Sequence, residues 1–235
     1  MFITMFDEHY ADWASLLIRS LARYHPNISV LAVGVDLTPA TQSHCLSQHK
    51  CIEIWNRTLG INDEARPAAV ANMRPRWLQE IVRSIRPQWC LFMDADLIVR
   101  STLDDLILGS SASDAALVFR KGLHRGIVYR RLQVAAGLVL LRNSGFTLIE
   151  RWCDLLDRCY RVDDVEPQAW FWEQICLLDA AEESRDLSIS AIDPSRYLSS
   201  PPFALEASIW SANVKVSEKA DIYDIFKAEV GGSDV

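Results

Sequence analysis

The sequence predicts an α/β fold with a mainly parallel sheet and helices on both of its faces. Short, continuous apolar runs alternate along the chain with longer segments in which apolar residues recur every three to four positions. Continuous apolar strands are typical of parallel sheets that are buried on both faces, and the alternation is typical of their helical crossovers. Half of the 235 residues are hydrophobic, which is enough for one domain with a substantial core.

The first half of the chain alternates strand and helix without a break. The predicted strands are residues 2–6, 29–35, 51–55 and a run that begins at Trp89. The predicted helices are residues 10–24, 38–48 and 67–85. Prolines mark their ends: Pro26 and Pro87 follow the first and third helices, and Pro39 and Pro67 lie in the first turns of the second and third.

The second half has fewer clear elements. Strands are expected at residues 115–119 and 133–141, helices at 144–160 and 168–181, weaker strands at 189–192 and 208–216, and a terminal helix at 220–230. We expect a single domain over residues 1–230, with a nucleotide-binding half at 1–110 and a sugar and acceptor half at 111–230. Residues 231–235 are expected to form a disordered tail.

Bulk properties exclude several classes of protein. The net charge of −7 argues against a nucleic-acid partner, which needs a basic surface. The first residues lack the basic and apolar regions of a signal peptide, and no apolar run approaches the ~18 residues of a membrane span. None of the six cysteines forms a C-x-x-C or zinc pattern. We therefore expect a cytoplasmic protein without an integral membrane segment, whose cysteines are reduced.

One apolar strand ends in two acids. The run from Trp89 to Met93 is followed by Asp94-Ala95-Asp96. In an extended segment, positions i and i+2 point the same way, so the two carboxylates can face one site. Hard cations such as Mg²⁺ or Mn²⁺ take such oxygen ligands, and open α/β sheets bind ligands at the carboxyl ends of their strands. The alternative is a strand exit with two solvated acids.

Three separated segments together resemble the GT-A fold of nucleotide-diphospho-sugar transferases, a Rossmann-related superfamily, and within it the glycogenin/galactosyltransferase-like, family 8-like branch. The first is Thr4-Met5-Phe6 with Tyr10 and the helix that follows. The second, residues 91–99, is similar to the family's D-x-D strand. The third is Val134–Asn143, followed by the acidic-Gln pair Glu173-Gln174.

The resemblance implies a metal-dependent glycosyltransferase with a nucleotide-diphosphate sugar as donor. Asp94 and Asp96 would hold Mn²⁺ or Mg²⁺ on the diphosphate and act as catalytic residues. Thr4, Phe6 and Tyr10 would line the pocket for the base and ribose. A UDP-sugar is the default donor, and the acceptor, which the resemblance leaves open, could be a saccharide, a lipid-linked glycan or a protein.

Other implied contacts lie farther along the chain. Arg74 or Arg76 would reach the phosphates, although residues two apart on a helix cannot both point to one spot. The small residues Ala136 and Gly137 would let a sugar ring approach the backbone. Glu173 and Gln174 would hydrogen-bond sugar hydroxyls and belong to the catalytic set.

The sequence departs from the family's pattern in two places. Gln133 or Val134 stands where the family's strand has an Asn. The family's C-terminal metal ligand is a His followed by a basic residue, whereas no His lies after residue 124 here. Asn213 would replace that ligand, with Lys215 or Lys219 as the phosphate contact. Otherwise water completes the metal shell, or the site is degenerate.

Three other interpretations remain open. In an aspartyl-nucleophile phosphatase, Asp94 would attack phosphorus and Asp96 would act as acid and base. A sugar-nucleotide-forming nucleotidyltransferase would need a Gly-rich loop after the first strand, and none is present. A non-catalytic binding or scaffold protein would keep the fold and lose the site. The sequence does not decide between retention and inversion at the anomeric carbon.

Overall fold

A computed structural model describes residues 1–61, 64–124, 127–160, 171–214 and 216–231, with the backbone alone for 121–124, 127–132 and 216. Lys215 and four of the five tail residues, 232–235, lie outside the described residues. The chain divides into two compact units that interleave along the sequence. Unit 1 comprises residues 1–58, 93–108 and 193–231, and unit 2 comprises residues 59–92 and 109–192.

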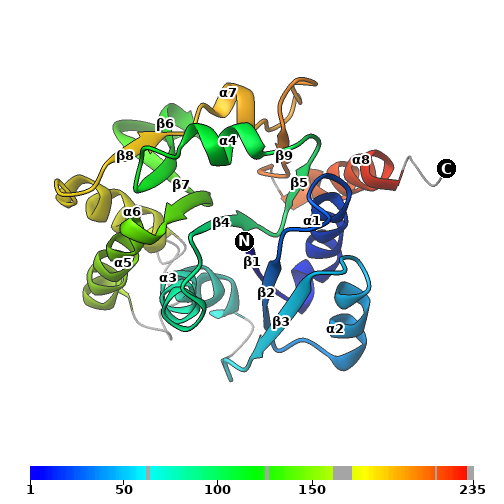
Figure 1. The fold of residues 1–235 in the computed structure, drawn as a ribbon. Helices are drawn as coiled ribbons and strands as arrows, with labels where there is room; N and C mark the ends of the chain where they lie inside the picture. The colour runs from blue at the N-terminus through cyan, green and yellow to red at the C-terminus, as the bar shows by residue number, and fades with distance from the viewer. Residues whose placement is uncertain (62–63, 125–126, 161–170, 215, 232–235) are drawn as a thin grey trace. The chain divides into compact units, whose positions relative to one another are not determined.

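Unit 1 begins with three parallel strands in the order β3-β2-β1, namely β1 (Phe2–Asp7), β2 (Val30–Val35) and β3 (Ile52–Arg57). Every residue of β1 and β2 is buried, as continuous apolar strands predict. Two helices supply the crossovers, α1 (Ala11–Tyr24) after a 3₁₀ turn (Glu8–Tyr10), and α2 (Pro39–Leu46) (Figure 1).

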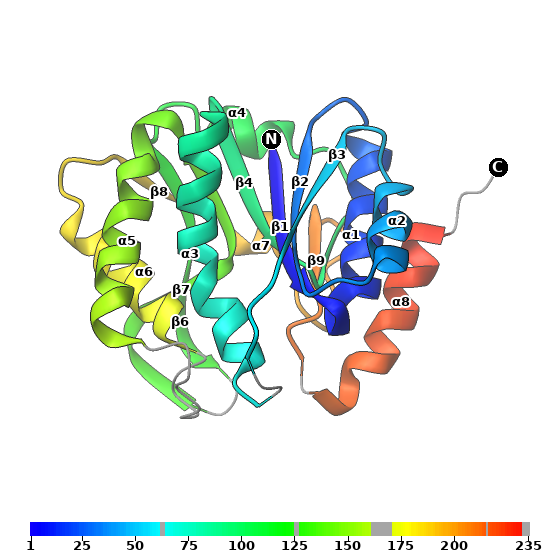
Figure 2. The same cartoon turned by 90° about the horizontal axis from the view of Figure 1, so that it is seen from below.

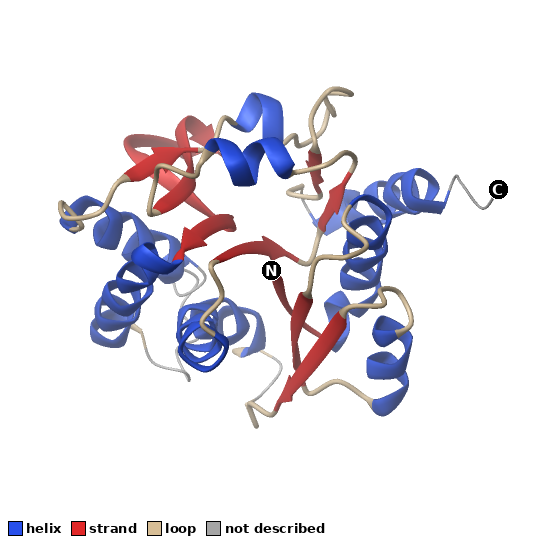
Figure 3. Cartoon of the chain, viewed as in Figure 1, coloured by secondary structure: helices blue, strands red, loops and turns tan. Residues whose placement is uncertain are grey.

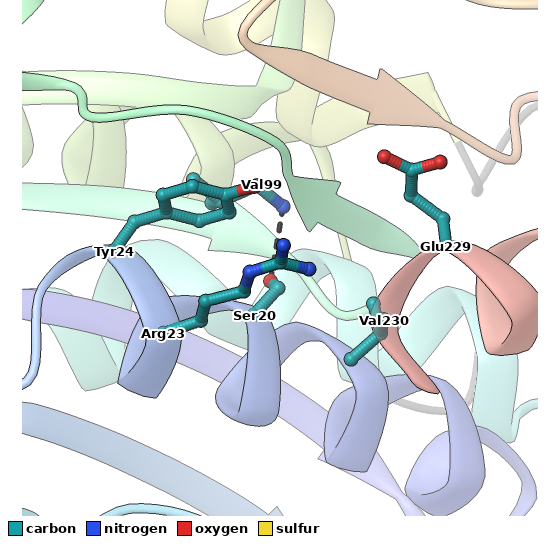
Figure 4. Close-up of a pocket in the computed structure, with 6 residues that line it drawn as sticks. All are labelled: Ser20, Arg23, Tyr24, Val99, Glu229 and Val230. Atoms are coloured by element: carbon teal, nitrogen blue, oxygen red, sulfur yellow. Dashed lines mark hydrogen bonds between the residues drawn. The ribbon is translucent and has the colours of Figure 1, made fainter. Parts of the chain in front are cut away.

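The later segments of unit 1 form a two-stranded antiparallel ribbon and three helices. They are β5 (Leu97–Val99), β9 (Ile209–Ser211), α4 (Asp104–Gly109), α7 (Pro194–Tyr197) and α8 (Lys219–Gly231), the last after a 3₁₀ turn (Val216–Glu218). The Ser20 hydroxyl accepts a hydrogen bond of 3.0 Å from the Val99 N–H, which attaches β5 to α1 (Figure 4). Figure 2 shows α8 lying beside α1.

An aromatic cluster fixes α8 in unit 1. Phe226 of α8 is fully buried, and Trp13 of α1 approaches it with ring centroids 5.7 Å apart. Trp210 of β9 stacks on Phe203 at 4.5 Å. Phe226 also lies near Phe203 and Trp210, so these rings pack α8 against α1 and β9.

Unit 2 combines parallel and antiparallel strands with three helices, of which α3 and α5 are amphipathic. The strands are β6 (Ala115–His124), β7 (Ile127–Arg142) and β8 (Ile189–Ala191), and β4 (Trp89–Asp94) passes from unit 2 to unit 1 after Phe92. The helices are α3 (Arg66–Ile85), α5 (Phe146–Cys159), which follows a 3₁₀ turn (Asn143–Gly145), and α6 (Trp172–Glu183). Helices α3 and α5 run side by side (Figures 2 and 3).

The antiparallel pairing of β6 and β7 shifts register at a bulge in β7. Leu117 pairs with Val139, whereas the next residue, Val118, pairs with Ala135. Residues 136–138 of β7 therefore have no counterpart on β6. Bulges re-aim side chains and occur often beside active sites. This one contains both small residues, Ala136 and Gly137, that the resemblance assigns to sugar approach.

The α/β prediction is confirmed: seven strands form a mostly parallel sheet with helices packed on it. The strand at 133–141 is longer than expected and runs antiparallel to β6. The helix expected over residues 168–181 is observed from Trp172 as α6, and residues 168–170 lie outside the described residues. No helix in the described part of the chain is long and apolar enough to cross a membrane. The single domain over 1–230 with its two halves remains a prediction.

Candidate functional site

The two aspartates occupy different local structures. Strand β4 ends at Asp94, and Ala95 and Asp96 form a turn before β5 begins. The alternation of an extended strand therefore applies to Asp94 and not to Asp96. Ala95 between them is buried and packs with Phe6 in the core of unit 1, which leaves both carboxylates half-buried at the surface of that core.

Backbone hydrogen bonds bring a distant segment to Asp96. Its carbonyl oxygen accepts a hydrogen bond of 2.9 Å from the Ala212 N–H, which extends the pairing of Leu97 with Ser211. Asn213, the predicted third metal ligand, directly follows Ala212 and is half-buried. Positions 96 and 213, which are far apart in sequence, thus lie on neighbouring backbone segments of unit 1.

Lys219 connects three segments of unit 1. As the first residue of α8, it directs its ammonium to Asp96, donating a hydrogen bond of 2.9 Å to Oδ2. The same nitrogen donates to the Tyr10 hydroxyl at 3.1 Å and lies 5.6 Å from the centroid of the Trp13 ring. The sequence predicted Lys219 and Tyr10 as donor contacts, and the structure brings both together with Asp96.

The charge of Lys219 is stabilised where it lies. Burial lowers the pKa of Lys219, but the Asp96 carboxylate and the Tyr10 hydroxyl oppose that effect, and the net pKa is raised. The lysine is therefore a fixed positive charge at neutral pH. Its side chain is 21% exposed and that of Asp96 is 18% exposed, so solvent screens the pair only in part.

Strand β1 and its turn position the remaining residues predicted for the base pocket. The Tyr10 N–H donates to Asp7 Oδ1 at 3.3 Å, which caps the 3₁₀ turn and fixes the tyrosine. Thr4 and Phe6 are buried, and Phe6 belongs to the core cluster that includes Ala95. The Thr4 hydroxyl has no hydrogen-bond partner among the described residues. Direct contact of Thr4 and Phe6 with a ligand remains a prediction.

The donor atoms suit a hard divalent cation. Asp94, Asp96 and Asn213 offer oxygens, the ligands that Mg²⁺ and Mn²⁺ prefer. Across the described residues, no three His, Cys, Asp or Glu side chains gather into a group that could hold a metal. Proteins commonly hold Mg²⁺ with one or two carboxylates and complete its shell with substrate phosphates and water. The residues therefore fit a cation whose remaining ligands come from a bound molecule and water.

In unit 2, the structure joins two predicted site residues that lie 99 positions apart. Arg74 of α3 donates to Glu173 of α6 at 3.1 Å, and their side chains are 11% and 2% exposed. The Arg74 guanidinium also lies 5.6 Å from the ring of Phe92. The Trp152 indole donates to the Glu173 carbonyl at 2.7 Å. These contacts fix Glu173 at the start of α6.

The other predicted residues of unit 2 are separate from this pair. Arg76 forms an ion pair with Asp157 of α5, and its Nε donates to Oδ1 at 3.0 Å. Gln174 is half-buried on α6, and Ala136 and Gly137 lie in the β7 bulge. Arg74 and Arg76 thus point to different partners, as their helical spacing predicts.

Sequence reasoning missed three contacting residues. Trp13 and Trp152 have the apolar spacing that is typical of a buried helix face, and Asp157 belongs to no motif. An aromatic or an acid in a helical stripe carries no sequence signal for such contacts. Two surface pockets, around Ser20, Arg23 and Tyr24 in unit 1 (Figure 4) and around Arg83 and Arg86 in unit 2, are lined by described residues outside the predicted set.

Comparison with solved structures identifies the fold. The galactosyltransferase LgtC in complex with donor and acceptor sugar analogues superposes with a TM-score of 0.66 at 12% identity, covering 100% of this chain and 96% of LgtC. A glycosyltransferase involved in glycosylation of the major capsid of PBCV-1 gives 0.62 at 12% identity, with 95% and 98% covered. GlyE of Streptococcus pneumoniae TIGR4 gives 0.59 at 15% identity, with 97% and 59% covered.

No protein-family model and no curated protein sequence matches the chain. Identities of 11–15% to the solved structures show the fold and leave the activity to be argued from the residues. The segments that resemble the GT-A superfamily lie in elements that superpose on its members over nearly the whole chain. The chain therefore has the GT-A fold of nucleotide-sugar glycosyltransferases, as its sequence predicted.

Proposed function

We propose that the chain is a glycosyltransferase that transfers a sugar from a nucleotide-diphosphate sugar, with a UDP-sugar as the first candidate and Mn²⁺ or Mg²⁺ as cofactor. The observation that carries the proposal is the cluster of Tyr10, Asp96 and Lys219 at the end of β4 in a GT-A fold. Its aromatic ring suits a base or ribose. Its carboxylate suits a cation, and its ammonium suits a phosphate.

Each residue of the cluster has a proposed task. Asp94 and Asp96, with Asn213 as a third oxygen ligand, would hold the cation. When bound, the cation would act as a Lewis acid that neutralises charge on the departing diphosphate. The Lys219 ammonium would donate to a phosphate oxygen, since a charge-assisted hydrogen bond is strong in a half-buried site. The Tyr10 ring would flank the base or ribose.

The unit 2 residues have proposed tasks that rest on the resemblance. Glu173 and Gln174 would bind sugar hydroxyls, and the bulge at Ala136 and Gly137 would let a sugar ring approach the backbone. The complex of LgtC with donor and acceptor sugar analogues supports a sugar acceptor for this chain, free or attached to lipid or protein.

The first test measures thermal stabilisation by UDP, GDP, ADP and CMP, each with and without Mn²⁺, on wild type and Asp96→Asn. A ligand at about 100 times its Kd stabilises a protein by roughly 2.7 kcal/mol, which is readily seen as a shift in Tm. We expect one nucleoside diphosphate to stabilise the wild type with Mn²⁺. It should lose that effect in Asp96→Asn, because the substitution removes one of the two proposed carboxylate ligands.

A matched control is Asp105→Asn, which changes an exposed aspartate of α4 in the same unit. It should respond to nucleotides as the wild type does. Absence of a shift with any of the four nucleotides would exclude the transferase as proposed. It would leave the non-catalytic protein with a GT-A fold or the phosphatase as the remaining interpretations.

A further inference from the structure

We propose that the Lys219 ammonium holds the place of the divalent cation on Asp96 in the nucleotide-free protein, so that cation and nucleoside diphosphate bind together. This inference rests on the proposed function and deepens it. It assigns Lys219 two partners in turn: Asp96 before the donor binds and a phosphate oxygen afterwards.

The Lys219 ammonium lies where it can compete with a cation for a carboxylate oxygen. Lys219 Nζ lies 2.9 Å from Asp96 Oδ2, a normal length for a charge-assisted hydrogen bond. A cation bound to the same oxygen would meet a positive charge at hydrogen-bonding distance. Lysine and cation therefore compete for that oxygen, and the second oxygen alone is a poorer ligand beside an ammonium.

The lysine is held in this position by further contacts. Its nitrogen also donates to the Tyr10 hydroxyl and lies 4.6 Å from the centroid of the Tyr10 ring. It occupies the first turn of α8, whose buried Ile222 and Phe226 anchor that helix in the core. A freely rotating surface lysine would give way to a cation at little cost, whereas this one must give up hydrogen bonds to Asp96 and Tyr10 and its place beside the Tyr10 and Trp13 rings.

A diphosphate offers the lysine another hydrogen-bond acceptor in place of Asp96. Phosphate oxygens accept strong hydrogen bonds from an ammonium, and they also complete the shell of a cation held by one or two carboxylates. A diphosphate can therefore bind the ammonium and the cation together, which Asp96 alone cannot do. A free cation gains none of this, so it should bind the nucleotide-free protein weakly.

The inference predicts effects of opposite sign for one substitution. Lys219→Met removes the competitor and leaves Asp96 without its compensating charge, so Mn²⁺ alone should bind more tightly. The same change removes a phosphate contact, so UDP in the presence of Mn²⁺ should bind more weakly. Hydrogen bonds to charged groups contribute about 1.5–3 kcal/mol, so each change should be roughly tenfold or more.

The experiment titrates Mn²⁺ into wild type, Lys219→Met, Lys219→Arg and Lys227→Met, with and without UDP, and follows free Mn²⁺ by electron paramagnetic resonance. Lys227 is an exposed lysine of the same helix, and its variant should match the wild type. Lys219→Arg keeps the charge and should keep Mn²⁺ binding weak. A thermal melt checks that each variant is folded.

The proposal is supported if Lys219→Met binds Mn²⁺ more tightly than wild type without UDP, and if adding UDP raises its Mn²⁺ affinity less than that of wild type. Binding of Mn²⁺ by this variant that equals or falls below that of the wild type, including no binding by either, overturns it. The proposed function is judged separately by the UDP arm. If UDP changes Mn²⁺ binding in none of the proteins, UDP is not the donor nucleotide, whatever the lysine does, and the four-nucleotide panel decides whether another one binds.

Discussion

At the scale of single residues, the ion pair between Arg74 and Glu173 is buried on both sides, with side chains 11% and 2% exposed. Breaking a buried pair by removing one partner costs about 3–5 kcal/mol, because a desolvated charge loses its compensation. We expect Arg74→Met to lower the free energy of unfolding of the protein by ~3 kcal/mol or more. Urea unfolding followed by circular dichroism measures this change.

Two comparisons isolate the pair. Arg83, also on α3, forms an ion pair with Glu150 of α5, and their side chains are 63% and 51% exposed, so Arg83→Met should cost no more than about 1 kcal/mol. The double variant Arg74→Met/Glu173→Gln should recover part of the stability lost in Arg74→Met, since neither charge then remains buried alone. Equal losses in Arg74→Met and Arg83→Met would show that burial does not decide the effect.

The sequence indicates candidate site residues, but it does not indicate which of them lie together. Asp94 and Asp96 stand out because an apolar strand ends in paired acids, and Lys219 was predicted as a phosphate contact. The pairing of Lys219 with Asp96, or of Arg74 with Glu173, depends on which helix faces arrive at the same point after the chain has folded. Such long-range proximity has no signal in composition or periodicity.

At the scale of elements, His25 joins the end of α1 to the segment before α4. Its Nε2 accepts a hydrogen bond of 3.0 Å from the Leu103 N–H, and its ring lies 5.0 Å from that of Phe2 in β1. Burial lowers the pKa of His25, and the Asp104 carboxylate, 3.9 Å away, opposes that effect in part. Protonation of Nε2 would abolish the acceptor, so the native state requires the neutral ring.

His49 follows the same pattern between α2 and β3. Its Nδ1 accepts from the Cys51 N–H at 2.9 Å, and its Nε2 lies 3.3 Å from the His25 carbonyl. Burial lowers the pKa of His49; the His25 carbonyl opposes this effect, and the charge of Lys50 adds to it. Both buried histidines therefore favour the neutral form in the folded protein.

These two histidines predict the sign of the pH dependence. Below their ordinary pKa of about 6.5, the unfolded chain binds protons that the folded protein resists, so stability falls as pH drops through that value. Above it, their contribution is constant. We expect the midpoint of urea unfolding to fall between pH 7.5 and 5.5 in wild type and in the exposed-site variant His9→Gln, and to fall less in His25→Gln. An unchanged slope in His25→Gln would refute the assignment.

Element prediction succeeded where a segment carries enough residues for its period to be counted. The long helices α1, α3 and α5 and the buried strands β1 and β2 are in this class. The elements β5, α4 and α7, of three to six residues, were missed, because so short a segment has no measurable period and is fixed by tertiary pairing such as that of β5 with β9. The β7 bulge depends on register, which the sequence does not state.

At the scale of the whole molecule, the proposed donor cluster draws on three distant parts of the chain that all belong to unit 1. Residues near positions 10, 96 and 219 come from the first, second and third segments of that unit. A ligand bound at the cluster should therefore stabilise three separate peptides at once, although they are more than 80 residues apart in the sequence.

Hydrogen–deuterium exchange with and without UDP and Mn²⁺ tests this expectation. Strand β1 is fully buried and should already exchange slowly, so protection should appear in less stable segments: residues 8–10, residues 95–97, and residues 216–222, which span the 3₁₀ turn and the start of α8. Asp96→Asn should lose all three changes together, because they depend on one site. Protection confined to unit 2 peptides, such as 66–85, would contradict the assignment and would place the diphosphate nearer to Arg74 and Arg76, the other phosphate contacts that the resemblance implies.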